Sequence, residues 1–326
     1  PISFGNINTI GGPAAPVSDS QNSKWVTSGF PAGNRVVFGP TVQISRHQRL
    51  LKPGDHSTGR EFNAQAIQTF TISPTLKITN NSIASYTARN TLSSYYYSEI
   101  IDPSWFAENR TEIVFTQGAG TVNTGLDIRH QRTKAYDDYF TEPVNVWDLT
   151  KDMNFVNIYN SVNFPNPFTS LPVPGWPGRY ATDGIQNGDT NDSKGTTIGP
   201  FAQGSWKFSD QLSLVVGGRL DHFHADVTEP LLPKRPQASI TVWIPNYNAS
   251  IIYKPTPASS VYVTYNNSRN TSGAVGNGGG ITGWNAAGTA LFKDNFLQPS
   301  ELIEVGTKYA LMQNKVFLNF AVFDQK

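Results

Sequence analysis

The sequence of 326 residues contains no cysteine, which excludes disulfide bridges and thiolate metal sites. It also has no run of about 18 or more apolar residues, so a membrane-spanning helix is excluded. Charged residues make up only 15% of the chain, and the formal net charge is +1. This composition gives no reason to expect a nucleic-acid partner. Neither a nucleophile-elbow motif nor a zinc-protease motif is present, so no enzyme is predicted.

Segments in which apolar and polar side chains alternate make up most of the sequence. A period of two is typical of β-strands that present one apolar face and one polar face. Gly and Pro, which number 28 and 22, are frequent between these segments. The pattern predicts strands at 36–46, 61–73, 75–88, 110–118, 123–133, 196–208, 212–227, 237–253, 259–268, 300–311 and 315–325.

The connections between these strands alternate in length. Strict alternation places all tight turns at one end of an antiparallel sheet and all long loops at the other. This layout is typical of a transmembrane β-barrel with short periplasmic turns and long extracellular loops, so we predict an all-β fold. Tight turns are expected at 73–75, 119–122, 209–211, 254–258 and 312–314, and long loops at 47–60, 89–109, 134–195, 228–236 and 269–299.

The clearest strand, 212–221, shows how the two faces differ. Leucine and valine side chains occupy one face, whereas Arg219 and Asp221 share the other. A barrel turns its apolar face to lipid and its polar face to the lumen. Charges two positions apart share a strand face, so Arg219/Asp221 and Asp127/Arg129 are expected to pair. The polar residues expected to face the lumen are Asp127, Arg129, Arg219, Asp221, Glu304 and Lys308.

A soluble β-sandwich with a buried apolar face is an alternative interpretation of the same alternation. The long loops argue against it, because structureless loops beyond about 15 residues are uncommon in compact domains. Aromatic residues also gather beside the tight turns, where an aromatic girdle at a bilayer interface would place them. They are Phe70, Trp206, Phe208, Tyr253 and Tyr309.

Four segments in the second half of the chain carry a recognisable pattern. They are Gly199-Pro200-Phe201-Ala202-Gln203, Gly217-Gly218-Arg219-Leu220-Asp221, Tyr253-Lys254-Pro255-Thr256-Pro257 and Glu304-Val305-Gly306-Thr307-Lys308-Tyr309. In this order and spacing they resemble the strands and turns of TonB-dependent outer-membrane receptors of the ferric-siderophore type. The resemblance covers residues 196–326 well and 60–133 loosely.

The resemblance implies a barrel of about 22 strands with a plugged lumen. The predicted strands would be about 11 of those ~22, so residues 1–326 are expected to form a partial antiparallel transmembrane barrel within one domain. The family's plug domain and closing C-terminal strands have no counterpart in the sequence. Because the chain starts at Pro1 and stops inside an alternating segment at Lys326, we expect an internal fragment of a longer protein.

The function implied by the resemblance is uptake across the outer membrane of a Gram-negative cell. A receptor of this kind binds a ferric siderophore at the cell surface and imports it with energy from the TonB complex, which acts on the plug. The implied partners are the siderophore, the TonB complex and outer-membrane lipid, with no cofactor beyond the iron carried in the chelate. A passive porin or adhesin barrel and a secreted glycan-binding β-sandwich module stay open as alternatives.

Aromatic and arginine side chains in the expected long loops are candidates for ligand binding. Aromatic rings offer a large rigid contact area, and arginine offers a planar charged fork for carboxylates or catecholates. Packing of these loops over the barrel mouth is the alternative role for each residue. The candidates are Tyr95, Tyr96, Tyr97, Trp105, Trp147, Tyr159, Trp176, Arg179, Tyr180 and Trp284.

Two further groups contain possible metal ligands, but neither has the spacing of a known site. His222, His224 and Asp226 share a strand face, and Asp183, Asn187, Asp189, Asn191 and Asp192 form an oxygen-rich stretch. We expect the histidines to be a solvated pair at the rim and the oxygen-rich stretch to be an ordinary polar loop, rather than metal sites. The glycine-rich stretch at 276–280 lacks the context of a phosphate-binding loop and is expected to be a mobile tip.

Overall fold

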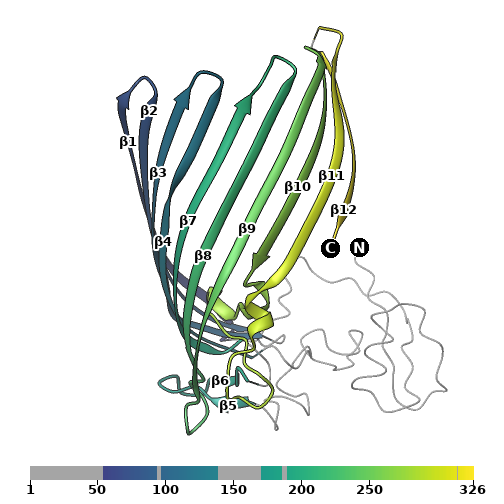
Figure 1. Cartoon of the computed structure of the whole chain (residues 1–326). Coiled ribbons are helices and arrows are strands. Elements are labelled where there is room, and N and C mark those ends of the chain that lie inside the picture. The colour runs from purple at the N-terminus through teal and green to yellow at the C-terminus, as the bar shows by residue number, and fades with distance from the viewer. Residues whose placement is uncertain (1–53, 94–96, 139–169, 186–188, 314) are drawn as a thin grey trace, which may run out of the picture. The chain divides into compact units, whose positions relative to one another are not determined.

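The computed structural model describes residues 54–93, 97–138, 170–185, 189–313 and 315–326. Within these ranges most residues lie in β-strands, and no helix is long and apolar enough to cross a bilayer. Ten long strands form one open sheet in the order β1-β2-β3-β4-β7-β8-β9-β10-β11-β12, and β5 pairs with β6 separately (Figure 1). The strands are β1 (His56–Ser73), β2 (Leu76–Ser93), β3 (Tyr97–Gln117), β4 (Gly120–Asp138), β5 (Ser170–Pro172), β6 (Tyr180–Thr182), β7 (Asn191–Lys207), β8 (Leu212–Thr228), β9 (Gln237–Thr256), β10 (Ser259–Asn270), β11 (Gln298–Leu311) and β12 (Val316–Gln325).

The long strands confirm the all-β, partial-barrel prediction. Each of the ten overlaps a segment that alternation identified, whereas the strand predicted at 36–46 lies outside the described residues. The tight turns gather at one end of the sheet, at the top of Figure 1. β1 and β12 are the two edges, so the sheet is not closed.

The long loop predicted at 89–109 is wrong. β2 continues to Ser93 and β3 already begins at Tyr97, so only residues 94–96 separate them. The loop-side ends of two other strands also extend beyond the predicted bounds: β4 continues to Asp138 and β7 begins at Asn191. A strand that projects beyond the hydrocarbon needs no apolar face. The alternation that marks a strand in the sequence therefore fades there, although the backbone pairing continues.

The chain divides into two compact units. The first, which we call the loop unit, comprises Pro1–Gly59, Arg89–Ile100 and Tyr136–Asp183. It includes the ends of β1 to β4 on the side of the long loops and the small hairpin β5–β6. The second, the wall unit, comprises Arg60–Ala88, Ile101–Ala135 and Gly184–Lys326. It holds the rest of the sheet and all five tight turns.

One face of the wall unit is apolar and open. In register on six successive strands, β7 to β12, lie Trp206, Leu214, Ile251, Val263, Val305 and Val322. Most of this row is exposed, with relative exposures of 46% at Val263 and 62% at Val322. A soluble sandwich would bury such a row, whereas a membrane barrel presents it to lipid. The side chains predicted to form an aromatic girdle, Phe70, Trp206, Phe208, Tyr253 and Tyr309, are exposed as well.

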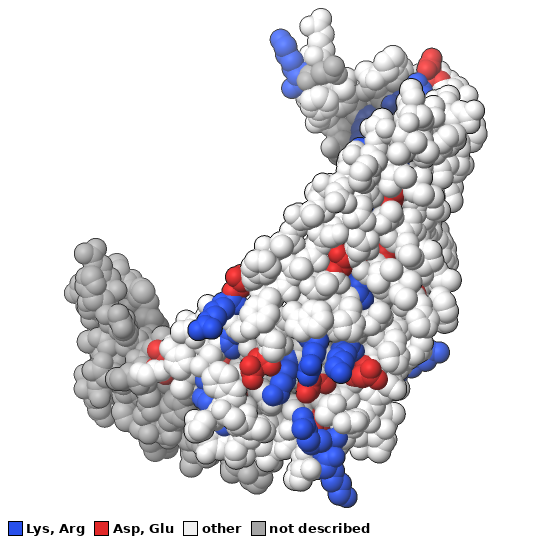
Figure 2. Space-filling model, turned by 90° about the vertical axis from the view of Figure 1, so that its left-hand side faces the viewer, with Lys and Arg blue, Asp and Glu red and all other residues white. Residues whose placement is uncertain are grey.

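Charged side chains avoid the middle of the face drawn in Figure 2. A wide expanse with few charges lies between a small charged group at the top and a band of Lys, Arg, Asp and Glu near the lower end. An apolar belt bounded by polar margins is the surface expected of a strand layer that crosses a bilayer.

The opposite, inner face changes character along the strands. Near the tight turns it is polar, but towards the long loops it becomes apolar at Phe223, Ala225 and Val227 of β8 and at Val242 and Ile244 of β9. Residues 271–297, which join β10 to β11, cover this apolar patch, and we call them the inner loop. Three short 3-10 turns organise the inner loop, namely η2 (Ser272–Ala274), η3 (Asn277–Gly279) and η4 (Lys293–Phe296).

A dry core fastens the inner loop to the wall. Five buried side chains of the loop pack with the five wall residues, and they are Ala274, Ile281, Trp284, Leu291 and Phe296. Hydrogen bonds add to this packing, since Ser104 Oγ donates to the Gly278 carbonyl at 2.8 Å and Gln131 Nε2 to the Gly279 carbonyl at 3.2 Å. The prediction of a mobile glycine tip at 276–280 is therefore wrong: Gly276 and Gly280 are buried.

Candidate functional site

A network of charges crosses the inner face of three strands. Arg219 on β8 binds Asp221 at 2.6 Å and reaches across β7 to Asp127 on β4 at 2.8 Å. The reach is possible because Gly199 lies between them: a Cβ there would overlap the Asp221 carboxylate. The Arg219/Asp221 pair forms as the two-residue spacing predicted, but Asp127 pairs with Arg219 rather than with Arg129.

Arg129 has a different set of neighbours. Its Nη1 donates to Glu108 Oε2 at 3.3 Å, and its guanidinium lies 4.0 Å from the centre of the Phe106 ring. The stacked geometry is the cation–π arrangement that arginine favours. Both partners are on β3, the neighbouring strand, which explains why a rule based on spacing within one strand missed them.

Glu304 and Lys308 on β11 meet at a tyrosine of the neighbouring strand. The hydroxyl of Tyr262 donates to Glu304 Oε1, and Lys308 Nζ lies 5.3 Å from the centre of the Tyr262 ring. Gly306 leaves the room that this ring occupies, since a Cβ at that position would overlap it. These side chains lie nearer the tight turns than the Arg219 network does.

A pocket of about 420 Å³ lies between the inner loop and the wall, within the size range of small-molecule sites. One side of the pocket is formed by charged and apolar residues of the wall, and the other side by the inner loop. It is lined by Arg129, Gln131, Thr197, Asp221, Phe223, Ile244, Arg269, Asn270, Thr271, Ala274, Val275, Gly279, Gly280, Ile281 and Phe296. Two of the predicted lumen residues, Arg129 and Asp221, thus meet in one pocket.

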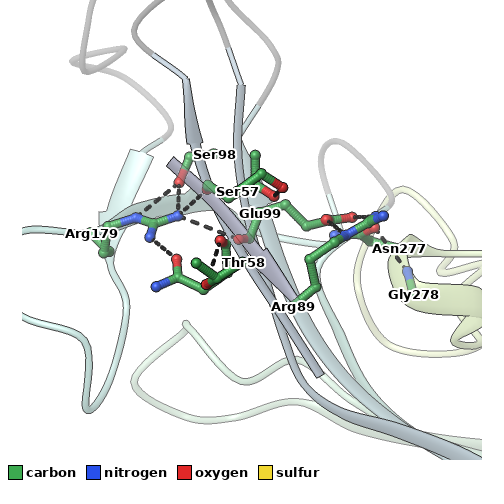
Figure 3. A network of polar contacts seen from close by, with 10 residues as sticks. Ser57, Thr58, Arg89, Ser98, Glu99, Arg179, Asn277 and Gly278 are labelled. Carbon is green, nitrogen blue, oxygen red and sulfur yellow. Dashed lines mark hydrogen bonds and ion pairs between the residues drawn. The ribbon is translucent and has the colours of Figure 1, made fainter. Parts of the chain in front are cut away.

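The structure places Arg179 in the loop unit, where it binds protein groups (Figure 3). Its side chain is only 7% exposed. Its guanidinium donates to Asn90 Oδ1, the Thr91 carbonyl, Ser98 Oγ and the Glu99 carbonyl. Arg179 therefore joins the β5–β6 hairpin to the ends of β2 and β3. Trp176 and Tyr180 of the same hairpin are half-exposed and exposed, respectively.

The remaining loop candidates fall in three places. Trp284 is buried in the core of the inner loop, and Trp105 on β3 packs beside His130 with 5.5 Å between ring centres. Tyr97 is the first residue of β3. Tyr95, Tyr96, Trp147 and Tyr159 lie outside the described residues.

The stretches with possible metal ligands form no cluster of three or more His, Asp or Glu in the part of the chain that the structure describes. His222 packs against the edge of Trp243 at 4.7 Å, and His224 lies 3.5 Å from Asp226. Burial raises the pKa of Asp189 above its ordinary value. Asn191 bonds backbone carbonyls of Asp189 and Asn277. Asn187 lies outside the described residues.

Arg269, Phe223 and Phe296 are pocket residues that the sequence did not single out. Arg269 ends a polar run at the loop side of β10, where no alternation marks a face. Phe223 begins an apolar stretch on the otherwise polar face of β8, continued by Ala225 and Val227, and this change is the signal that the inner wall is covered there. The inward fold of residues 271–297 has no counterpart in the sequence pattern.

Comparison with known proteins identifies the architecture. The sequence matches the family described as TonB dependent receptor-like, beta-barrel over residues 4–326. Solved structures are similar as well, and three of them are described next. The siderophore receptor PiuA from Acinetobacter baumannii has 17% identity and a TM-score of 0.56, over 82% of this chain and 40% of PiuA. The ferric-catecholate import receptor Fiu from E. coli K12, in its closed form, has 14% identity and a TM-score of 0.55, over 86% and 42%. The ferric yersiniabactin uptake receptor FyuA from Yersinia pestis has 13% identity and a TM-score of 0.53, over 84% and 37%.

The chain spans less than half the length of these receptors. At such identities the likeness shows the fold alone, and the family match over residues 4–326 carries the assignment. An open sheet with an apolar outer face and a charged, partly covered inner face is consistent with it. The chain belongs to the TonB-dependent receptor β-barrel family.

Proposed function

We propose that the chain is part of the barrel of an outer-membrane receptor that binds a ferric siderophore at the cell surface and imports it. The observation that carries this proposal is the family match over residues 4–326. The three similar structures are named as receptors for siderophores or iron chelates. The distribution of side chains on the two faces of the sheet supports transport rather than catalysis.

Energy for import comes, in this proposal, from the TonB complex acting on a plug domain elsewhere in the parent protein. The inner wall of β4, β7 and β8 offers a surface for such a domain, since its charges are held in fixed pairs around Arg219. A passive porin would need no such partner. Dependence on TonB therefore separates the two functions.

The test is growth and uptake in cells that lack the parent gene. Under iron limitation, we expect loss of growth on one or a few ferric chelates from a panel, together with loss of uptake of radioactive iron in that chelate. Deleting TonB should abolish the same uptake in cells that retain the receptor. Uptake that persists without TonB would favour a porin. Unchanged growth on every chelate in the panel would reject iron uptake as the function.

A further inference from the structure

The outer face of β4, β7, β8 and β9 changes from apolar to charged in ordered steps towards the long loops. One row in register across these four strands consists of Ile128, Ile198, His222 and Trp243. Both isoleucines and the tryptophan are exposed. An exposed tryptophan at the end of an apolar belt is typical of a membrane–water interface. This row therefore marks the outer limit of the lipid-facing belt.

Two rows further towards the long loops, the same face carries charges. Arg132 of β4 is in register with Lys194 of β7, and Lys194 is in register with Asp226 of β8. Arg132 follows Ile128 by four residues, or about 13 Å of strand, which is about 10 Å of height at a tilt of about 40°. The head-group layer beyond the hydrocarbon is about 5–8 Å thick, and long basic side chains reach back into it. These charges therefore face lipid head groups.

Lys194 and Asp226 carry opposite charges but do not pair with each other. Among the described residues, no carboxylate lies within ion-pair distance of the Lys194 ammonium group. Asp226 lies 3.5 Å from His224, whose ring is charged only when it is protonated. Arg132 approaches Asp192 at 3.9 Å. One ammonium group and one carboxylate on this face are thus available to a ligand.

A pocket of about 480 Å³ lies between these groups, and we call it the outer pocket. Its charged lining side chains are Arg132, Lys194, Asp192 and Asp226, so two positive charges balance two negative ones. A balanced pocket exerts little long-range attraction on an ion of either sign. It is suited to a ligand that carries both charges close together, because each charge then meets its opposite within the pocket.

We infer that the outer pocket binds the head group of an outer-leaflet lipid that carries a phosphate and a primary ammonium group, as phosphoethanolamine does. Arg132 and Lys194 donate to the phosphate oxygens, and the ammonium group of the lipid donates to Asp226. The acyl chains of the same lipid lie along the apolar belt below Ile198 and Trp243. This inference goes beyond the uptake of iron. It depends on the position of the sheet in the membrane and stands whichever cargo is imported.

The test measures lipid binding to the full-length parent protein in detergent by native mass spectrometry. Three phospholipids with the same acyl chains differ only in the terminal group of the head. Phosphatidylethanolamine carries a primary ammonium group, phosphatidylcholine a quaternary one without N–H donors, and phosphatidylglycerol no cation. The wild type should bind phosphatidylethanolamine about threefold to tenfold more tightly than the other two, as expected of a charge-assisted hydrogen bond that solvent partly screens.

Two variants separate the two ends of the head group. Asp226→Asn should remove most of the preference for phosphatidylethanolamine without weakening the binding of phosphatidylglycerol. Lys194→Gln removes a contact to the phosphate, which all three lipids share, and should weaken all three by a similar factor. The matched controls are Asp210→Asn and Lys207→Gln, which make the same changes in an ion pair of a tight turn. All four side chains are exposed, so the variants should fold, and the controls should bind the three lipids as the wild type does.

Four results would overturn the assignment. Equal wild-type affinities for the three lipids would remove the selectivity that the pocket predicts. If Asp226→Asn kept the full preference, the ammonium group would bind elsewhere. If Asp210→Asn reduced the preference as much as Asp226→Asn does, the effect would come from the overall charge of the protein. If water-soluble phosphoethanolamine displaced phosphatidylethanolamine at an equal concentration, the pocket would be a site for the free solute rather than for a lipid.

Discussion

Gly280 lies so close to Asn191 that a Cβ at position 280 would overlap the side-chain amide. Asn191 is fully buried at the start of β7. Its Nδ2 donates to the Asp189 carbonyl at 2.8 Å and to the Asn277 carbonyl at 3.2 Å. The amide thus joins the wall to the inner loop at a point where only glycine fits.

Gly280→Ala should loosen the inner loop. The overlap costs about 1–3 kcal/mol, so opening of residues 271–297 should become roughly 5–150 times more frequent. Limited proteolysis within this segment measures that change. Gly218→Ala is the control, because its Cβ would meet nothing closer than 3.7 Å. Equal cleavage rates in the two variants would contradict a tight junction at residue 280.

Arg219→Gln should destabilise the wall, because it leaves Asp127 and Asp221 facing each other without a cation. The pairs are only partly exposed, and we expect a loss of about 1–3 kcal/mol. The midpoint of heat-induced unfolding of the parent barrel in detergent measures it. Neutralising both carboxylates in the Arg219→Gln background should recover part of the loss.

Lys207→Gln provides a matched comparison for the Arg219 result. Lys207 pairs with Asp210 at 2.9 Å in an exposed tight turn, and the loss there should be much smaller, because solvent screens exposed ion pairs. A drop as large as that of Arg219→Gln would mean that removing any basic residue weakens the barrel. The Arg219 network would then have no special role.

The pH should affect the attachment of the inner loop through Asp189. Burial raises the pKa of Asp189 above its ordinary value of 3.8, so the attached state favours the protonated carboxyl. Its contribution to stability is complete below about pH 3.8 and is lost as the pH rises through the raised pKa. Hydrogen exchange of the Asn277 amide, which donates to the Asp189 carbonyl at 3.0 Å, reports the change after correction for intrinsic rates.

Asp189→Asn removes the titrating group but keeps the backbone carbonyl that accepts these bonds. The pH dependence of the Asn277 amide should therefore disappear in this variant. An unchanged pH profile would show that a different group titrates.

Val263 and Thr264 test which face of β10 contacts lipid. Val263 belongs to the exposed apolar row, and Thr264 faces inward with its hydroxyl 2.9 Å from Ser250 Oγ. A lysine on the lipid face near the middle of the bilayer costs about 2–4 kcal/mol, and one in the lumen costs far less. Val263→Lys should therefore reduce barrel assembly, measured by refolding into lipid vesicles, and Thr264→Lys should not. The reverse order would place hydrocarbon on the other face.

The strands could be predicted because hydrocarbon imposes alternation. Wherever both a lipid face and a wet face exist, as at 212–221, the sequence shows a period of two and the strand is found. The ends of β2 and β3 escaped prediction, since Arg89-Asn90-Thr91 meets no lipid and needs no apolar face. The register between strands cannot be predicted from a single sequence either. Asp127 and Arg219 meet because the register brings their strands into line and because Gly199 leaves room between them.

The candidate site was less predictable for the same reason. Arg129 and Asp221 were found because they alternate with apolar neighbours. The packing of Trp284 and Phe296 onto β8 and β9 depends on the path of a loop whose residues have no repeating pattern. The sequence identified Trp284 as an aromatic residue in a long loop and hence as a candidate for ligand binding. In the structure it is buried and packs the inner loop against the wall.

The length of the strands sets how far the barrel wall extends beyond the lipid surface. β9 has 20 residues, or roughly 66 Å of extended chain, and a tilt of about 40° reduces its height to about 50 Å. The lipid-facing apolar band of such barrels is only about 25 Å tall. About half of the strand height therefore lies outside the hydrocarbon. If the proposed uptake holds, a ligand would contact the projecting strand ends before it reaches the level of the lipid head groups.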